Sequence, residues 1–194
     1  MFTYKRNIKE GAKKSINGQG SLDDKKDAKH NIRSWILAMF SVLSVTTYPI
    51  FFLYFQNADE VSFNEVAVPL FIFIASGLVL FSMFLLLSKD VNKSAVITNL
   101  FMLVLMNYVL LEKGVQVIIP TLYYWHILLI FLFILAHIAW FICKNVSKEL
   151  AKTAVLVMFI VFGGLIALNG VVSTPIIINK ISIEKQLNEQ KNSI

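Results

Sequence analysis

The sequence contains little of what disulfide formation, metal binding and catalysis require. Its 194 residues include one cysteine, Cys143, so no disulfide can form within the chain. Three histidines and that cysteine do not follow the spacing of a zinc site, and we expect neither a metal nor another cofactor. The GxSxG, Walker A, HExxH and CxxC motifs are missing as well. These absences predict a protein that is not an enzyme.

Charged residues are also scarce, at 15% of the chain, whereas hydrophobic residues make up 57%. Soluble domains average about a quarter charged residues. The uncharged stretches are 34–58, 66–88, 94–111, 114–143 and 153–179. A membrane-spanning helix needs about 20 apolar residues, with roughly 17 as the minimum. The predicted fold class is therefore an all-α integral membrane protein with about five transmembrane helices, a multi-pass protein of the cell membrane.

Three parts are predicted along the chain. Residues 1–33 are a basic cytoplasmic tail whose low hydrophobicity predicts disorder. Residues 34–174 are the membrane domain, and residues 175–194 are a short polar extracytoplasmic tail. The predicted transmembrane helices are 35–56, 66–87, 95–111, 121–142 and 153–173. Glu112 and Lys113 interrupt the third helix, and the VQVIIP stretch after them either lies in the membrane interface or lengthens the helix.

Basic residues are distributed unevenly between the two predicted sides of the membrane. Fourteen Lys and Arg residues fall in the N-terminal tail and the second and fourth connections, and four fall on the other side. The positive-inside rule then places the N terminus in the cytoplasm and, with five spans, the C terminus outside. Four or six spans, with both tails on one side, is the alternative. Nine of the eighteen basic residues precede the first apolar stretch, so the charge is explained by topology and no nucleic-acid partner is expected.

The first outward connection, YFQNADEVSF, combines turn-forming residues with carboxylates. Asn57 and Asp59 are residue types that close a turn onto their own backbone. A solvated turn is therefore one interpretation. The other is that Asp59 and Glu60, beside a bilayer, bind a cation or position a sugar or an amine. Because adjacent carboxylates seldom converge on one proton, they do not suggest a general acid and base pair.

Three asparagines lie within the predicted spans. Asn99 and Asn107 are eight residues apart and so about 80° apart around a helix, which predicts that they share a broad face. Asn169 lies beside a ridge of small residues in the fifth span. Amides in membranes commonly form hydrogen bonds between helices, so we predict packing roles for all three rather than substrate recognition.

Two histidines lie in the fourth span. His126 belongs to an aromatic cluster at the outer edge, while His137 lies deeper, and the two are about 16 Å apart along the helix. They cannot share a metal ion. A proton relay would need a carboxylate partner, and none of the predicted spans contains Asp or Glu, which argues against an ion-coupled pump.

The order of several features resembles a known architecture. A Thr47-Tyr48-Pro49 element in the first helix, the Asn57, Asp59 and Phe63 element, the basic SKDVNKS connection and an Asn107-Tyr108 pair follow one another. Over about residues 45–174 the chain resembles the N-terminal multi-span region of bacterial surface-polymer proteins that carry a sulfatase-like or phosphoglycerol-transferase-like extracellular domain. The residues that would form that domain's active site have no counterpart here. The resemblance therefore implies an anchor without its enzyme.

These observations favour a non-catalytic anchor or accessory in the assembly of a cell-envelope polymer of the polysaccharide or teichoic-acid type. Its expected partners are the lipid bilayer and a membrane or extracytoplasmic protein. One alternative is a small transporter or lipid-translocating subunit, in which a shared polar path would be lined by Pro49, Asn99, Asn107, His137 and Asn169. Another is an immunity or self-protection membrane protein. The transporter alternative predicts that these side chains converge on one cavity, whereas the anchor predicts that they pair locally.

Overall fold

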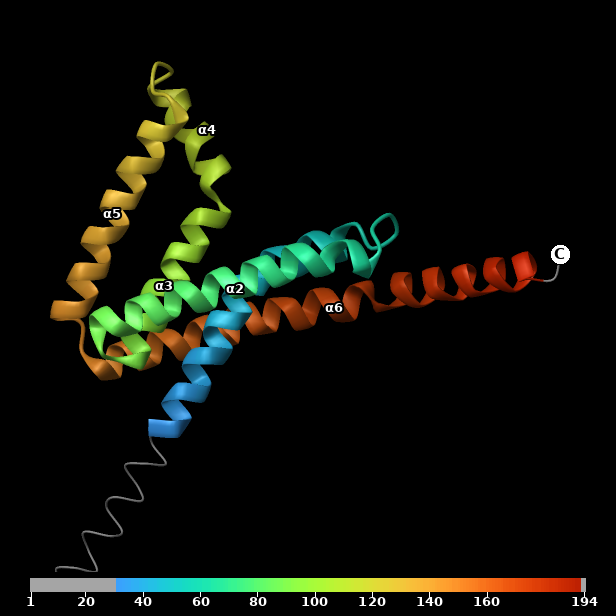
Figure 1. The fold of residues 1–194 in the computed structure, drawn as a ribbon, viewed down its shortest axis with the longest axis horizontal. Helices are drawn as coiled ribbons and strands as arrows, with labels where there is room; N and C mark the ends of the chain where they lie inside the picture. The colour runs from blue at the N-terminus through green and yellow to red at the C-terminus, as the bar shows by residue number, and fades with distance from the viewer. Residues whose placement is uncertain (1–30, 193–194) are drawn as a thin grey trace, which may run out of the picture. The chain divides into compact units, whose positions relative to one another are not determined.

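The computed structural model describes residues 31–192, which form α-helices and connections and, in that range, no β-strand (Figure 1). The first helix is Asn31–Gln56, and the helices after it are α2 (Phe63–Ser88), α3 (Val91–Met106), α4 (Tyr108–Ile118), α5 (Tyr124–Asn145) and α6 (Lys148–Asn192). The predicted disordered tail lies largely outside the described residues.

Most of these helices are long and apolar enough to cross a membrane. Within the described residues four helices meet this criterion alone, and the number is five if the bent pair formed by α3 and α4 is one span. The predicted fold class, an all-α integral membrane protein with about five transmembrane helices, is therefore confirmed. The exact limits of the spans in the bilayer and the sides on which the termini lie stay predictions.

The third predicted span is not one straight helix. α3 and α4 meet at Asn107 with a bend of 63°. The Asn107 side-chain amide donates to the carbonyl oxygen of Leu103 at 2.7 Å, and such bonds compete with the regular helical ladder. α4 then continues to Ile118, so the first residues of the VQVIIP stretch lengthen the helix.

Residues 175–192 are helical and do not form a tail separate from the last helix. α6 continues through Pro175 as a single helix to Asn192, 45 residues in all. Proline lacks the N–H that would bond to the carbonyl four residues earlier, yet the neighbouring turns keep the helical path. Residues 175–192 are thus an extension of the last membrane helix.

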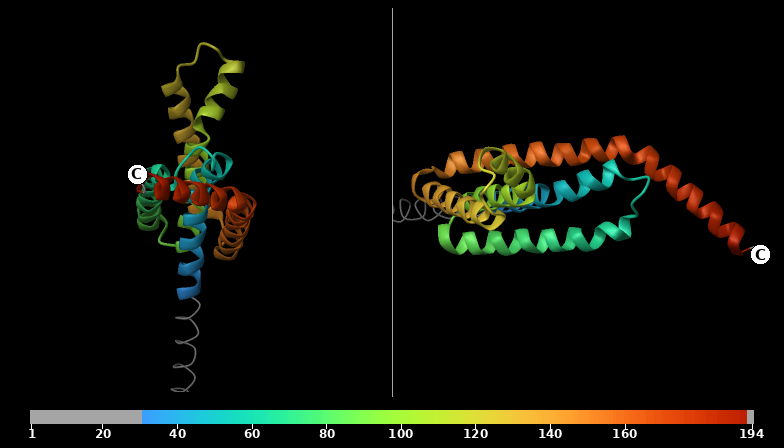
Figure 2. Two further views of the ribbon diagram at one scale, coloured as in Figure 1. Left: turned by 90° about the vertical axis from the view of Figure 1, so that its right-hand side faces the viewer. Right: turned by 90° about the horizontal axis from the view of Figure 1, so that it is seen from above.

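Residues 37–56 of the first helix run between α2 and α6 (Figure 2, right). On one side Gly77 of α2 meets Thr46, and on the other Gly170 of α6 lies against the ring of Phe55. Tyr48 contacts the ring of Phe162 of α6 edge-on, with 5.4 Å between ring centroids. Small residues therefore let the backbone of the first helix approach those of α2 and α6. In a membrane the lipid is as apolar as the side chains, so helices associate through such close packing rather than through the hydrophobic effect.

The buried core lies toward the α2–α3 and α5–α6 connections. Its members come from all the long helices and are Ala38, Val42, Phe81, Phe84, Ala95, Val96, Ile97, Ile142, Ala151 and Val155. Two polar contacts hold this end together. Asp90 caps α3 by accepting from the backbone N–H groups of Asn92 and Lys93, both at 3.0 Å. The Lys93 ammonium donates to the Cys143 carbonyl oxygen at 2.9 Å, joining α3 to the end of α5.

Candidate functional site

The first connection, Asn57 to Ser62, is organised by its own backbone. The Asn57 amide donates to the carbonyl oxygen of Leu53 at 2.7 Å, and the Asn57 carbonyl oxygen accepts from the N–H groups of Glu60 and Val61 at 3.1 and 2.9 Å. Asp59 and Glu60 are exposed, and no hydrogen bond of their carboxylates appears within the described residues. The geometry is that of a solvated turn, with two carboxylates facing outward.

α6 fastens this connection to the bundle. The Lys180 ammonium donates to the carbonyl oxygens of Val61 and Ala58 at 3.1 and 3.4 Å. About two turns earlier on the same helix, the Ser173 hydroxyl donates to the carbonyl oxygen of Phe55 at 3.1 Å. These bonds satisfy carbonyls at the end of the first helix and in the turn, which would otherwise need water.

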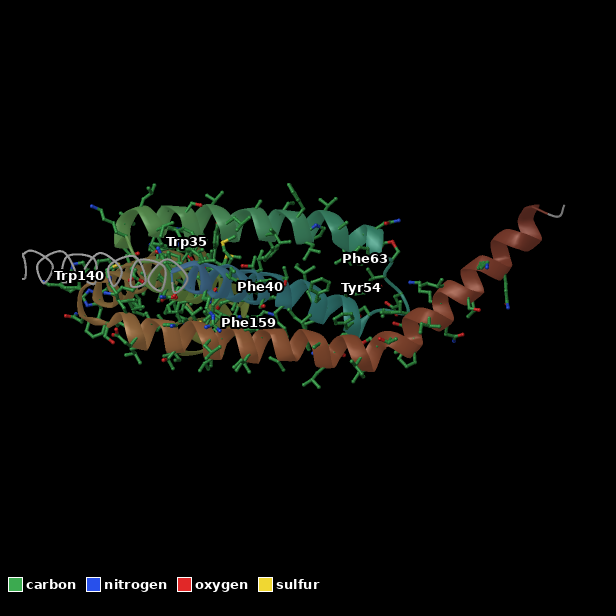
Figure 3. All side chains as sticks on the ribbon, turned by 90° about the horizontal axis from the view of Figure 1, so that it is seen from below. Trp35, Phe40, Tyr54, Phe63, Trp140 and Phe159 are labelled. Atoms are coloured by element: carbon green, nitrogen blue, oxygen red, sulfur yellow. The ribbon has the colours of Figure 1, made fainter. Side chains whose placement is uncertain are left out.

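A cavity of about 420 Å³ lies between the connection and α6. It is lined by Tyr54, Ala58, Val61, Ser62, Phe63, Asn64, Ile177, Lys180 and Ile181. The rings of Tyr54 and Phe63 stand edge to face with 5.9 Å between centroids, and Figure 3 shows them close together at the end of the bundle that α6 runs past. Sequence reasoning missed Lys180, although it is the first charge after the uncharged stretch 153–179 and so marks where the apolar part of the last span ends.

Asn99 forms a second polar site, deep between helices. Its side chain is fully buried, and its amide nitrogen donates to the Ser41 hydroxyl of the first helix at 2.8 Å and to the Met158 sulfur of α6 at 3.3 Å. The amide oxygen has no partner among the described residues. Asn99 thus links three helices, as the packing prediction for this residue requires.

Asn107 and Asn169 do not join Asn99. Asn107 lies exposed at the break between α3 and α4, where it bonds to Leu103, so the predicted broad face shared with Asn99 ends at the bend. The Asn169 amide donates to the carbonyl oxygen of Leu165 in its own helix at 2.8 Å. Each of these two amides is therefore occupied by a carbonyl one turn earlier.

The histidines lie apart in the same way. His126 stacks on the ring of Trp125 with 3.5 Å between centroids, and its buried Nδ1 has no partner among the described residues. His137 is exposed, and its ring lies 5.7 Å from that of Trp140. The described residues contain no group of three or more His, Cys, Asp or Glu side chains that could hold a metal ion.

The predicted positions thus divide into separate places: a turn with Asn57, Asp59 and Glu60, a buried amide, and isolated contacts at the break between α3 and α4 and along α5 and α6. The cavity beside Lys180 is lined by none of Asn99, Asn107, Asn169 and His137, and the described contacts of these four side chains do not join them to one another. Comparisons with protein-family models, with curated proteins and with solved structures find no match to this chain.

Proposed function

We propose that this chain acts without catalysis, as a multi-pass anchor or accessory in the cell membrane of a bacterium that assembles a cell-envelope polymer. The observation that carries this proposal is the local pairing of the intramembrane polar groups. Asn99 bonds to Ser41 and Met158, while Asn107 and Asn169 bond within their own helices. A transporter would direct such groups toward a common aqueous path. An anchor needs no such path, and Asn99 serves it by linking three helices.

The proposed role in the assembly of an envelope polymer rests on the sequence resemblance. Residues 45–174 resemble the anchor region of surface-polymer proteins, in which the enzymatic domain follows the last span on the outer side. An outward C terminus is what the uneven distribution of Lys and Arg predicts. The extension of α6 beyond Pro175 would offer such a domain, or a separate protein partner, a helical attachment on that side.

Cysteine labelling tests the orientation. In a Cys143→Ser background, single cysteines replace Ser62 in the first connection or Ser193 near the C terminus. We expect an impermeant thiol reagent to label both positions in intact cells, because both lie outside in the five-span arrangement. Lys89→Cys, in the α2–α3 connection, is the control that should label only after the cells are opened. Labelling at 62 without labelling at 193 in intact cells, with both labelled after lysis, would instead mean an even number of spans.

Complementation tests the function. Deletion of the gene should lower the amount of envelope polymer, measured as polymer sugar and phosphate per mass of purified envelope. Asn107→Leu and Asn169→Leu should each restore the polymer to the wild-type amount, because each removes only a bond within one helix. The amount of protein in the membrane is measured alongside. A deletion strain with unchanged polymer would refute the anchor, and loss of polymer in either variant at a normal protein amount would favour a polar transport path.

A further inference from the structure

The cavity beside Lys180 has the composition of a lipid headgroup site. We propose that it binds a zwitterionic phospholipid, with the phosphate against the Lys180 ammonium and the cationic end of the headgroup toward the carboxylates of the first connection. This inference does not depend on the role in polymer assembly, because it concerns only the connection and α6.

The cavity lies at the depth of phospholipid headgroups. It forms where the first helix ends at Gln56 and α2 begins at Phe63, and Lys180 is the first charge after 27 uncharged residues of α6. Helix ends and the first lysine after an apolar stretch mark the boundary between hydrocarbon and headgroups. A volume of about 420 Å³ falls within the range of about 300–1,000 Å³ that is usual for small-ligand pockets.

Donors for a phosphate line this cavity. The hydrogen bonds to Val61 and Ala58 use two of the three N–H donors of Lys180 and hold its ammonium in place. One N–H donor remains for a ligand. Asn64 also lines the cavity, and an asparagine amide can donate to a phosphate oxygen, whereas the Ser62 hydroxyl already donates to the Glu65 carboxylate at 3.2 Å. Charge-assisted bonds of this kind are about twice as strong as neutral ones.

The other side of the cavity is apolar. Phe63, Ile177 and Ile181 line it, and Ile181 is 59% exposed. A free phosphate ion would leave these side chains uncovered, whereas the glycerol backbone and upper acyl chains of a phospholipid would cover them. Burial of apolar surface on both partners therefore favours a lipid over an inorganic anion.

The charges around the cavity select the headgroup. Lys180 is the one basic residue in the lining, while Asp59, Glu60 and Glu65 belong to the same connection and to the first turn of α2. Three carboxylates repel a headgroup with a net negative charge and attract the ammonium of a zwitterionic one. The expected order of affinity is therefore phosphatidylethanolamine above phosphatidylglycerol.

Native mass spectrometry of the purified full-length protein tests the site. The protein is titrated with phosphatidylethanolamine or phosphatidylglycerol, and the lipid-bound fraction is measured. Lys180→Gln should weaken phosphatidylethanolamine binding at least about tenfold, the effect of losing one charge-assisted bond. Lys185→Gln, an exposed lysine five residues further along α6, is the matched control and should bind as the wild type does.

Two further variants keep the result interpretable. Ile177→Trp fills the cavity while leaving Lys180 in place, and it should also lose the lipid. The double variant Asp59→Asn, Glu60→Gln should bind phosphatidylglycerol more tightly, so that the difference in affinity between phosphatidylethanolamine and phosphatidylglycerol becomes smaller. Unchanged binding in both Lys180→Gln and Ile177→Trp would overturn the site, and equal affinity of the wild type for the two lipids would overturn the zwitterionic assignment. Displacement of the lipid by millimolar inorganic phosphate would identify a phosphate site instead of a lipid site.

Discussion

Asn99→Asp is expected to destabilise the helical bundle by about 3 kcal/mol, the cost of placing an aspartate inside a membrane helix. Asn99 is fully buried, and its amide nitrogen donates to Ser41 and Met158. A carboxylate of the same shape cannot donate those bonds and brings a charge into a site with no cation among its contacts. The measurement is unfolding of the purified protein in a denaturing detergent, followed by circular dichroism.

Asn107→Asp is the matched control. Both residues belong to the same predicted span, but Asn107 is exposed at the break between α3 and α4. Its carboxylate would reach water or headgroups, so the loss of stability should be clearly smaller than at Asn99. Asn99→Leu should also cost less than Asn99→Asp, because it removes the hydrogen bonds without adding a charge. Equal losses for Asn99→Asp and Asn107→Asp would show that Asn99 is not enclosed as described.

A pair of alanine substitutions tests the contact between the first helix and α2. A Cβ atom at Gly77 would lie 2.6 Å from Thr46 Oγ1 and 3.0 Å from Thr46 Cγ2. Thr46 is itself fully buried and short, so it cannot move aside easily. Gly77→Ala should therefore force the two helices apart at a cost of about 1–3 kcal/mol, the usual range for overpacking.

The Thr46→Ala background shows whether that clash is the cause. Removing Oγ1 and Cγ2 leaves the Thr46 Cβ as the nearest atom, at 3.4 Å from the added methyl group. Gly77→Ala should then cost little, and the double-mutant cycle should give a coupling of about 1 kcal/mol or more. Gly164→Ala is the control, because a Cβ there meets nothing within 4 Å. A cost at Gly77 that is the same in both backgrounds would mean that Thr46 is not the obstacle.

The sequence predicted the helical membrane fold because the evidence for it is local. Runs without charge, interrupted by charged connections, are enough to count spans. The sequence also predicted that Asn99 would bond to another helix, since an amide within an apolar span finds its partners there. The turn at Asn57 was predicted as well, although its backbone carbonyl closes the turn and its side chain bonds back to Leu53.

The features that sequence reasoning missed depend on residues far apart in the chain. Lys180 meets Ala58 and Val61 from more than 100 positions away, and no local pattern connects them. The break at Asn107 could not be predicted either, because no proline or glycine lies beside it in the sequence. There the choice between a straight helix and a bent one depends on which acceptor the Asn107 amide finds, and the apolar residues on either side are compatible with both.

If α3 and α4 form one span with α3 along the bilayer normal, the bend at Asn107 removes a mismatch between segment length and bilayer thickness. As one straight helix, α3 and α4 would be about 41 Å long, well over the hydrocarbon thickness of about 30 Å. Along the axis of α3, with the bend of 63°, the same residues rise only about 32 Å. The bend thus shortens the height of the segment without removing a residue, and Glu112, Lys113 and Gln116 lie in the part that turns away. In that arrangement a bend at one residue fits a hydrophobic segment that is too long, with charges near its end, to the thickness of the bilayer.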